Sequence, residues 1–278
     1  MIYLILAVIS SALVSITMRL SGKYTKNNIS MLAVSYAFCI PLAGMYLHMG
    51  KGIFTAPGMP VAVLLGSIAG FLYLAGFILL QWNVATNGVV LSATFAKLGV
   101  LVPTILSLFL FGERLRLMQG IGVVTALAAI LLINFDHGHE SARSKSGLVV
   151  LLIGGGLADS MVKFYEEYGT PKFEEFYLWF TFASAFLFSV ILVLYKKQRL
   201  HRNDVIWGIL LGIPNYFSAR FLLKALGRIP AVITYPTYCV SMIVVVSLVG
   251  VIIFKEKLNK RQVTGIGIIL LALVMLNI

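Results

Sequence analysis

The sequence predicts an all-α integral membrane protein, with ten transmembrane helices arranged as two inverted five-helix repeats around a central cavity. Composition gives the membrane class: 60% of the 278 residues are hydrophobic and 12% are charged, whereas a soluble domain is about 45–50% apolar and about 25% charged. The apolar residues form ten stretches of roughly twenty residues, the length that a helix needs to cross a bilayer. An internal similarity between the two halves predicts the repeats.

Very short loops join the ten predicted spans. Turn signals separate neighbouring spans, for example at Asn87-Gly88 and at Gly227 to Pro230. The first span has no basic leader and no small-residue cleavage site, so we expect it to be retained rather than removed as a signal peptide. The spans are predicted at residues 2–20, 30–50, 60–82, 88–111, 116–134, 147–165, 174–195, 205–226, 231–254 and 260–277.

The two halves of the chain share a pattern of residues. Phe111-Gly-Glu-Arg-Leu115 precedes the fifth span, and Phe254-Lys-Glu-Lys-Leu258 precedes the tenth, 143 residues later (254 − 111). An odd number of spans in each repeat reverses the direction of the second repeat, which is typical of inverted-repeat proteins. We therefore predict an N-terminal repeat over residues 1–135, a linker over 136–146 and a C-terminal repeat over 147–278. The spans after these motifs match as Gln119 with Gln262, Gly122 with Gly265, Ala129 with Ala272 and Asn134 with Asn277.

Basic residues predict the orientation. The net charge is +12, and most Lys and Arg flank the spans, where they contact anionic lipid headgroups; we expect no nucleic-acid partner. They gather after the odd-numbered spans, so these loops are predicted cytoplasmic. Both termini are then predicted on the non-cytoplasmic side of the plasma (inner) membrane. Cys39 and Cys239 lie in predicted spans and form no disulfide or metal motif.

Charged side chains inside the spans are the strongest functional signal. Lys97 lies near the middle of the fourth span, where a cation costs about 2.5–3.5 kcal/mol to insert. Chains keep such groups where they face a cavity or a buried partner. Arg220 lies inside the eighth span, and Asp159 is the only acid well inside a predicted span. The excess of positive charge favours an anionic ligand, and an Arg suits a carboxylate or phosphate group.

Helical spacing adds neighbours to these charges. Residues at i, i+4 and i+8 share one face of the eighth span, and shorter polar stripes run along the fourth, sixth and ninth spans. We expect the Arg220→Gln variant to lose function while its fold stays intact. The predicted substrate-binding residues are Thr94, Lys97, Tyr216, Arg220, Lys224, Tyr238 and Ser241, and those predicted to relay protons or pair charges are Asp159 and Lys163.

Structural roles are the alternatives at these positions. Lys224 is near a helix end and could extend to the membrane interface. Asp159 could serve to neutralise Lys163 or Lys97. The cluster of Glu166, Glu167, Glu174 and Glu175 is predicted to be a solvated loop. Pro103 could kink its helix. The tract from His137 to Glu140 lies in the predicted linker and lacks further ligands, so we expect no metal site, and we expect no cofactor.

The chain resembles the drug/metabolite transporter superfamily, most closely its EamA-type branch. Gly112-Glu113-Arg114 with Gln119 and Gly122 carries the resemblance in the first half, and Glu256-Lys257 with Gln262 and Gly265 carries it in the second. The resemblance covers the whole chain. It implies a basket of helices around a central cavity, with the fifth and tenth helices as supports or as contacts of a homodimer.

We therefore expect a secondary active transporter that moves a small, anionic metabolite by alternating access, driven by a gradient or by exchange. No ATP-binding segment is present in the sequence. Three alternatives stay open: an exporter of neutral or amphipathic metabolites or drugs by proton antiport, an integral membrane enzyme acting on a lipid-linked substrate, and a non-transporting scaffold or sensor. The enzyme would need paired carboxylates or a His-containing set near one interface, and we expect none.

Overall fold

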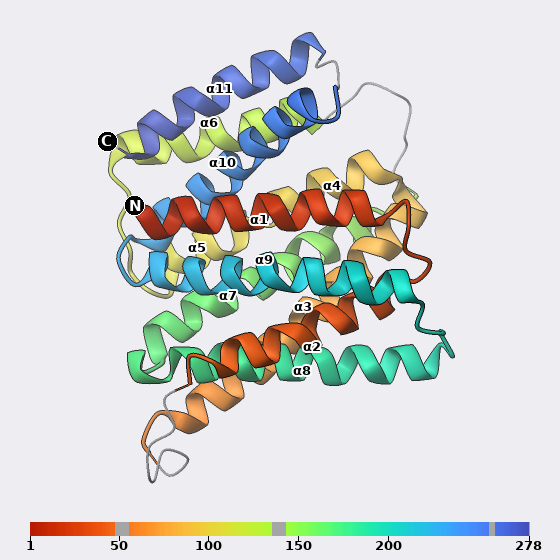
Figure 1. The fold of residues 1–278 in the computed structure, drawn as a ribbon. Coiled ribbons are helices and arrows are strands. Elements are labelled where there is room, and N and C mark those ends of the chain that lie inside the picture. The colour runs from red at the N-terminus through yellow and green to blue at the C-terminus, as the bar shows by residue number, and fades with distance from the viewer. Residues whose placement is uncertain (48–55, 135–142, 256–258, 278) are drawn as a thin grey trace. The chain divides into compact units, whose positions relative to one another are not determined.

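The computed structural model describes residues 1–47, 56–134, 143–255 and 259–277, which form helices joined by short turns, with no strand among them (Figure 1). Eight helices in these residues are long and apolar enough to cross a membrane. Asn28–Gly44 and Leu117–Ile133 are shorter apolar helices. The predicted all-α integral membrane class is confirmed at this level.

The helices overlap the predicted spans and differ from them mainly at their ends. The longest, α3, continues to the Asn87-Gly88 turn. The helices are α1 (Ile2–Ser21), α2 (Asn28–Gly44), α3 (Met59–Asn87), α4 (Val89–Leu98), α5 (Leu101–Phe109), α6 (Leu117–Asn134), α7 (Lys145–Tyr168), the short 3-10 helix η2 (Pro171–Phe173), α8 (Glu174–Tyr195), α9 (Arg202–Leu226), α10 (Ala231–Ile252) and α11 (Lys260–Asn277). Most of the predicted linker, including His137 to Glu140, and also Glu256 and Lys257, lie outside the described residues.

The predicted fourth span is interrupted between α4 and α5. Pro103 has no backbone N–H with which to reach the carbonyl of Gly99 four residues earlier. That carbonyl instead accepts a hydrogen bond from the backbone N–H of Val102, 3.0 Å away, in a tighter turn. The regular α-helical hydrogen bonding therefore stops at Gly99 and Val100, while Leu91–Phe109 as a whole is still one apolar segment long enough to cross a membrane, in agreement with the predicted fourth span. Lys97 lies one residue before the end of α4.

The chain forms two compact units, and each combines segments from both halves of the sequence. The first unit contains Met1–Leu74 and Met161–Gly227, and the second contains Ala75–Ser160 and Arg228–Ile278. Helices α3 and α7 each contribute one part to each unit. The two compact units therefore do not coincide with the two predicted repeats, and the repeat organisation stays a prediction.

Glycines permit close helix packing in the first unit. Helices α1 and α2 pack on α9, and α2 packs on α8. A methyl group added at Gly70 of α3 would overlap the backbone carbonyl oxygen of Thr181 in α8. A methyl group at Gly208 of α9 would lie 2.7 Å from the carbonyl oxygen of Met31 in α2. These helices therefore touch backbone to backbone, as small residues allow in membranes.

The second unit is built around α10, which packs on α5, α6 and α11, and around the pair α6 and α11. Helix α7 approaches the break between α4 and α5. A methyl group added at Gly156 would overlap the carbonyl oxygen of Gly99. Gly156 thus allows α7 to lie against the residues that follow Lys97.

Substituting Gly70 by Ala is expected to destabilise the protein by about 1–3 kcal/mol, because the added methyl group must push two packed backbones apart. Gly120 in α6 is the matched control, since a methyl group there meets no atom within 4 Å. Gly120→Ala should be neutral or stabilise by up to about 1 kcal/mol. Thermal unfolding of the detergent-purified variants measures the difference, and equal melting temperatures would contradict the packing.

Candidate functional site

The structure divides the predicted site residues between the two units. The first unit contains Lys163, Tyr216, Arg220 and Lys224, and the second contains Thr94, Lys97, Asp159, Tyr238 and Ser241. The two groups of residues differ in how their charges are compensated, and each group is described separately below.

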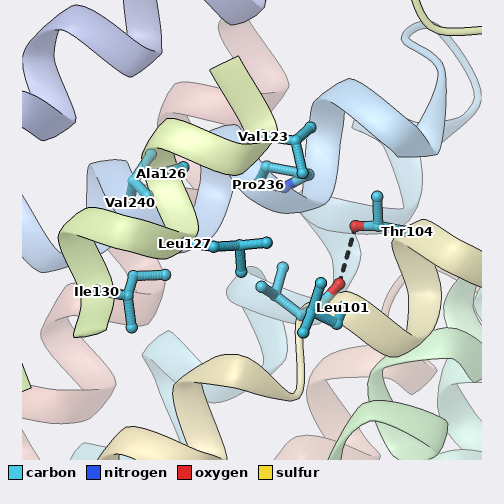
Figure 2. A pocket seen from close by; sticks show the side chains of 9 residues that line it. Leu101, Thr104, Val123, Ala126, Leu127, Ile130, Pro236 and Val240 are labelled. Carbon is cyan, nitrogen blue, oxygen red and sulfur yellow. Dashed lines mark hydrogen bonds between the residues drawn. The ribbon is translucent and has the colours of Figure 1, made fainter. Parts of the chain in front are cut away.

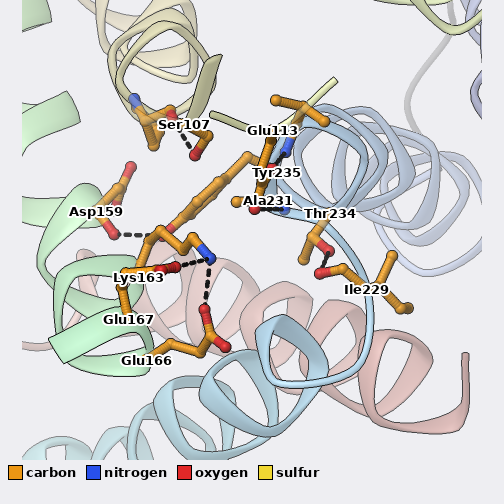
Figure 3. A network of polar contacts seen from close by, with 12 residues as sticks. Ser107, Glu113, Asp159, Lys163, Glu166, Glu167, Ile229, Ala231, Thr234 and Tyr235 are labelled. Atoms are coloured by element: carbon orange, nitrogen blue, oxygen red, sulfur yellow. Dashed lines mark hydrogen bonds and ion pairs between the residues drawn. The ribbon is translucent and has the colours of Figure 1, made fainter. Parts of the chain in front are cut away.

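In the second unit, two side chains on one face of α10 contact the backbone carbonyls of the charged residues Lys97 and Asp159. The hydroxyl of Tyr235 donates a hydrogen bond to the carbonyl oxygen of Asp159 in α7, at 2.8 Å (Figure 3). The Sγ atom of Cys239 lies 3.9 Å from the carbonyl oxygen of Lys97 in α4, a long contact. Tyr235 and Cys239 are four residues apart and share a helix face. Helices α4 and α7 are therefore both anchored to α10 at their charged residues.

The side chains of Lys97 and Asp159 attract each other. Lys97 is half-buried and Asp159 is exposed, and the positive charge of Lys97 acts on the Asp159 carboxylate. Both charges also act on the thiol of Cys239. A nearby opposite charge lowers the free-energy cost of keeping either charge in a low-dielectric region. Lys97 and Asp159 therefore stabilise each other's charged forms.

Other predicted residues of this unit contribute less. Thr94 is fully buried, so its hydroxyl is not accessible to a ligand in this conformation. Tyr238 and Ser241 are half-buried on α10. A nearby apolar cavity of about 10 Å³, between α5, α6 and α10, is lined by residues that include Thr104, Leu127 and Pro236 (Figure 2). It has room for one water molecule at most, so it is a packing defect rather than a substrate site.

In the first unit, Arg220 has an acidic partner that the sequence interpretation missed. The Nε–H of Arg220 donates to Oε1 of Glu175 at 2.8 Å, and the hydroxyl of Tyr216 donates to Oε2 of the same carboxylate at 2.9 Å. The ring of Tyr46 covers the guanidinium, with its centroid 3.5 Å from Cζ. We call Tyr46, Glu175, Tyr216 and Arg220 the Arg220 cluster. As predicted, Tyr216 and Arg220 act from one face of α9.

The prediction that Glu174 and Glu175 belong to a solvated loop is wrong. They form the first turn of α8, where the helix dipole favours acidic residues. The side chain of Glu175 is only 17% exposed, against 14% for Arg220. One signal was available in the sequence: the start of the seventh span and the end of the eighth lie at the same membrane face, so Glu175 was within reach of Arg220.

The two other cations predicted for the site in the first unit, Lys163 and Lys224, also have acidic neighbours. Lys163 is 5% exposed and pairs with Glu166 at 2.5 Å and Glu167 at 3.0 Å on its own helix (Figure 3). Lys224 attracts Glu174, and its Nζ lies 5.9 Å from the centroid of the Tyr3 ring. The argument from uncompensated positive charge is therefore weaker than the sequence suggested.

Glu113, part of the motif that carries the family resemblance, holds the start of α10. Its Oε1 accepts a hydrogen bond from the backbone N–H of Ala231 at 3.0 Å, and its Oε2 accepts one from Val232 at 2.9 Å (Figure 3). A carboxylate at this position satisfies amides that have no partner within the helix and interacts favourably with the helix dipole. Gly112, with φ +64°, provides the turn that directs Glu113 toward α10.

Glu113→Ala is expected to destabilise the protein by about 1–2 kcal/mol, because the start of α10 loses its cap. Hydrogen exchange at the amides of Ala231 and Val232 should accelerate. The exposed neighbour Arg114 is the control, and Arg114→Ala should leave both measurements unchanged. Unaltered exchange at the two amides in Glu113→Ala would contradict the capping role.

Together these observations define a multi-pass membrane protein with charged clusters inside its spans. Residues 149–278 match the sequence model of the EamA-like transporter family. This match confirms the resemblance to the drug/metabolite transporter superfamily over the second half of the chain. It supports a membrane transporter of small molecules.

Two further similarities cover the whole length. An uncharacterized protein of Haemophilus influenzae is 26% identical in an alignment that covers 95% of this chain and 93% of that protein. One crystal structure matches 99% of this chain and 94% of its own, with a TM-score of 0.75 and 14% identity. At this identity the match to the crystal structure shows a shared fold alone.

Proposed function

We propose that this protein is a secondary active transporter that moves a small, anionic metabolite across the membrane by alternating access, driven by a gradient or by exchange. The observation that carries the proposal is that Lys97 acts electrostatically on Asp159, while residues on one face of α10 contact the backbone carbonyls of both within membrane-spanning helices. Intramembrane charges of this kind mark substrate or proton pathways. The family match supplies the class of activity.

Contacts related by the 143-residue offset support the inverted repeat that such a transporter needs. Gly122 of α6 lies against Leu276 of α11, where an added methyl group would be 3.0 Å from Cγ of Leu276. Gly265 of α11 lies against Ile133 of α6. Adding 143 to Gly122 gives Gly265, and adding 143 to Ile133 gives Leu276. The two contacts are therefore equivalent under exchange of the repeats.

The starts of α6 and α11 support the same equivalence. Oε1 of Gln119 accepts a hydrogen bond from the backbone N–H of Arg116 at 3.0 Å. Oε1 of Gln262 accepts one from Asn259 at 2.9 Å, and both residues of this second pair lie 143 positions after the first. Two helices that begin with the same capping bond at the repeat offset favour two structurally equivalent halves.

The chemistry proposed for the second unit is competition for one cation. Asp159 and the anionic group of the substrate both attract Lys97, so one must leave before the other is fully paired. A proton on Asp159 removes its charge and leaves Lys97 to the substrate. Asp159 thus couples substrate binding to the proton, and Tyr235 and Cys239 keep the two backbones in place. Lys163, paired with Glu166 and Glu167, has a structural role.

Charge compensation favours one alternative. Arg220 and Lys163 have acidic partners at hydrogen-bond distance, which lowers the preference of these residues for anions. An exporter of neutral or amphipathic compounds by proton antiport, with Asp159 as the proton carrier, would need no uncompensated cation.

Counterflow in proteoliposomes tests the proposal. Vesicles containing the purified protein are preloaded with inorganic phosphate, succinate, a neutral sugar or an amphipathic cation, and entry of the labelled compound is followed. We expect exchange of an anion without chemical change, and at least a tenfold lower rate in Lys97→Gln. Lys145→Gln, at an exposed lysine of α7, is the control. A chemically altered compound would indicate an enzyme, and an unaffected Lys97→Gln variant would reject the site.

We further propose that the protein lies in the plasma (inner) membrane with both termini on the non-cytoplasmic side, as the distribution of basic loops indicates. A homodimer is compatible with this arrangement. A C-terminal reporter that is active only in the cytoplasm would overturn the orientation.

A further inference from the structure

The Arg220 cluster has the donor geometry of an anion site. Two donors from one face of α9, the Nε–H of Arg220 and the hydroxyl of Tyr216, bind the two different oxygens of one carboxylate at 2.8 Å and 2.9 Å. Charge-assisted hydrogen bonds of this kind recognise carboxylate and phosphate groups in general. The same two donors could bind a carboxylate or phosphate group of a ligand as well as the carboxylate of a glutamate side chain.

The surroundings hold the two donors in place. The Tyr46 ring lies on the guanidinium face at 3.5 Å from Cζ and stacks against Tyr216 with a centroid separation of 6.2 Å. Stacking fixes the plane of the guanidinium and directs its N–H groups sideways, toward the carboxylate. Tyr216 is fully buried. An anion that replaced the Glu175 carboxylate would meet the same prearranged donors.

We propose that Glu175 is a built-in occupant of this anion site: its carboxylate takes the position of the anionic group of a substrate, which binds by displacing it. This inference rests on the proposed transport of an anion. The tethered carboxylate competes at the effective concentration of a linked group, which is in the mM range for short flexible links. It therefore lowers the apparent affinity for free anions.

Replacement of the Glu175 carboxylate by a substrate anion gives Arg220 an anionic partner both before and after substrate binds. Without substrate, Glu175 neutralises the guanidinium, so the empty protein does not carry an isolated charge within the membrane. With substrate bound, the displaced carboxylate stays close to a second cation. Lys224 lies one turn further along α9 and already attracts Glu174, the residue before Glu175. The cluster thus accepts an anion without leaving either charge uncompensated.

Thermal unfolding with added anions tests the inference. The detergent-purified wild type and Glu175→Gln are titrated with succinate and with inorganic phosphate, and potassium chloride at equal ionic strength is the control. For at least one of the two anions, we expect half-maximal stabilisation of Glu175→Gln at a concentration at least tenfold lower than for the wild type. The gain should disappear in the Glu175→Gln/Arg220→Gln double variant, which lacks the guanidinium.

The outcomes separate this inference from the proposed function. Equal anion responses in Glu175→Gln and wild type would overturn it, as would a gain that persists in the double variant. If Glu175→Gln does not fold, Glu175→Asp keeps the charge and shortens the reach, and it should give a smaller gain of the same sign. If anions stabilise Glu175→Gln at lower concentration but the protein transports nothing, the anion site is supported and the transport function is rejected. If the protein transports an anion but Glu175→Gln responds to anions as the wild type does, only the displacement of Glu175 by substrate is rejected.

Discussion

Arg220→Gln is expected to destabilise the protein by about 3 kcal/mol, because it leaves the Glu175 carboxylate in a largely buried position without its cation. Removing one partner of a buried ion pair typically costs about 3–5 kcal/mol, and the lower end applies here because the two side chains are 14% and 17% exposed. Only the hydroxyl of Tyr216 would still bind the carboxylate. The melting temperature of the purified protein measures the loss.

The double variant Arg220→Gln/Glu175→Gln is expected to recover most of this stability, since it removes both charges and keeps two side chains able to form hydrogen bonds. Replacing a buried pair by neutral groups is often close to neutral in free energy. Arg202→Gln, at an exposed position of the same helix, is the control and should change little. If the single and double variants melt at the same temperature, Glu175 does not depend on Arg220.

This pairing revises the expectation drawn from the sequence that Arg220→Gln leaves the fold intact. A transport defect in the single variant would mix a folding effect with a functional one. The double variant separates them, because it restores the charge balance while still lacking the guanidinium that binds an anion. It is therefore the better variant for testing the role of Arg220 in substrate binding.

Asp159→Asn is expected to abolish the dependence of anion transport on pH. In the wild type, transport should increase as the pH falls, because protonation of Asp159 releases Lys97 for the substrate. An Asn at this position is permanently neutral, so Lys97 is released at every pH. Net accumulation driven by a proton gradient should then fall at least tenfold, whereas exchange of labelled for unlabelled substrate should persist. Proteoliposomes with imposed pH gradients measure both.

The groups that face Asp159 make this prediction specific. Lys97 contributes the opposing charge, the Cys239 thiol of α10 lies within the influence of both charges, and the Tyr235 hydroxyl of α10 binds the backbone carbonyl of Asp159. Cys239→Ser keeps the size of the side chain, and its pH dependence should match that of the wild type. A pH response that survives in Asp159→Asn would assign proton coupling to another residue and return Asp159 to a structural role beside Lys97.

Interpretation of the sequence succeeded where the physics is local. The apolar stretches and their approximate ends follow from composition alone, because the free energy of placing a segment in a bilayer depends on the residues of that segment. Gly70 and Gly208 lie at close contacts between helices, which the absence of a side chain permits. Pro103 was recognised as a source of distortion, but its effect, a tighter turn at Gly99 within one membrane-spanning segment, required the structure.

Interpretation failed where a partner lies far along the chain. Glu175 and Arg220 are 45 residues apart, and Glu113 lies 118 residues before the first amide that it caps. Composition could show that a cation inside a span needs compensation, but several acids were available to each cation. Asp159 was a candidate partner for both Lys97 and Lys163, and the structure associates it electrostatically with Lys97.

The amino-acid sequence by itself determined that this protein crosses a membrane many times and carries charges within its spans. Only the tertiary structure decided how the distant charges are matched, with Glu175 at Arg220 and Asp159 near Lys97, whereas Glu166 and Glu167 pair with Lys163 within one helix. The physical reason is range. Insertion into a bilayer depends on the sum of local transfer free energies, whereas an ion pair depends on a separation of a few Å between helices, and helix packing alone sets that separation.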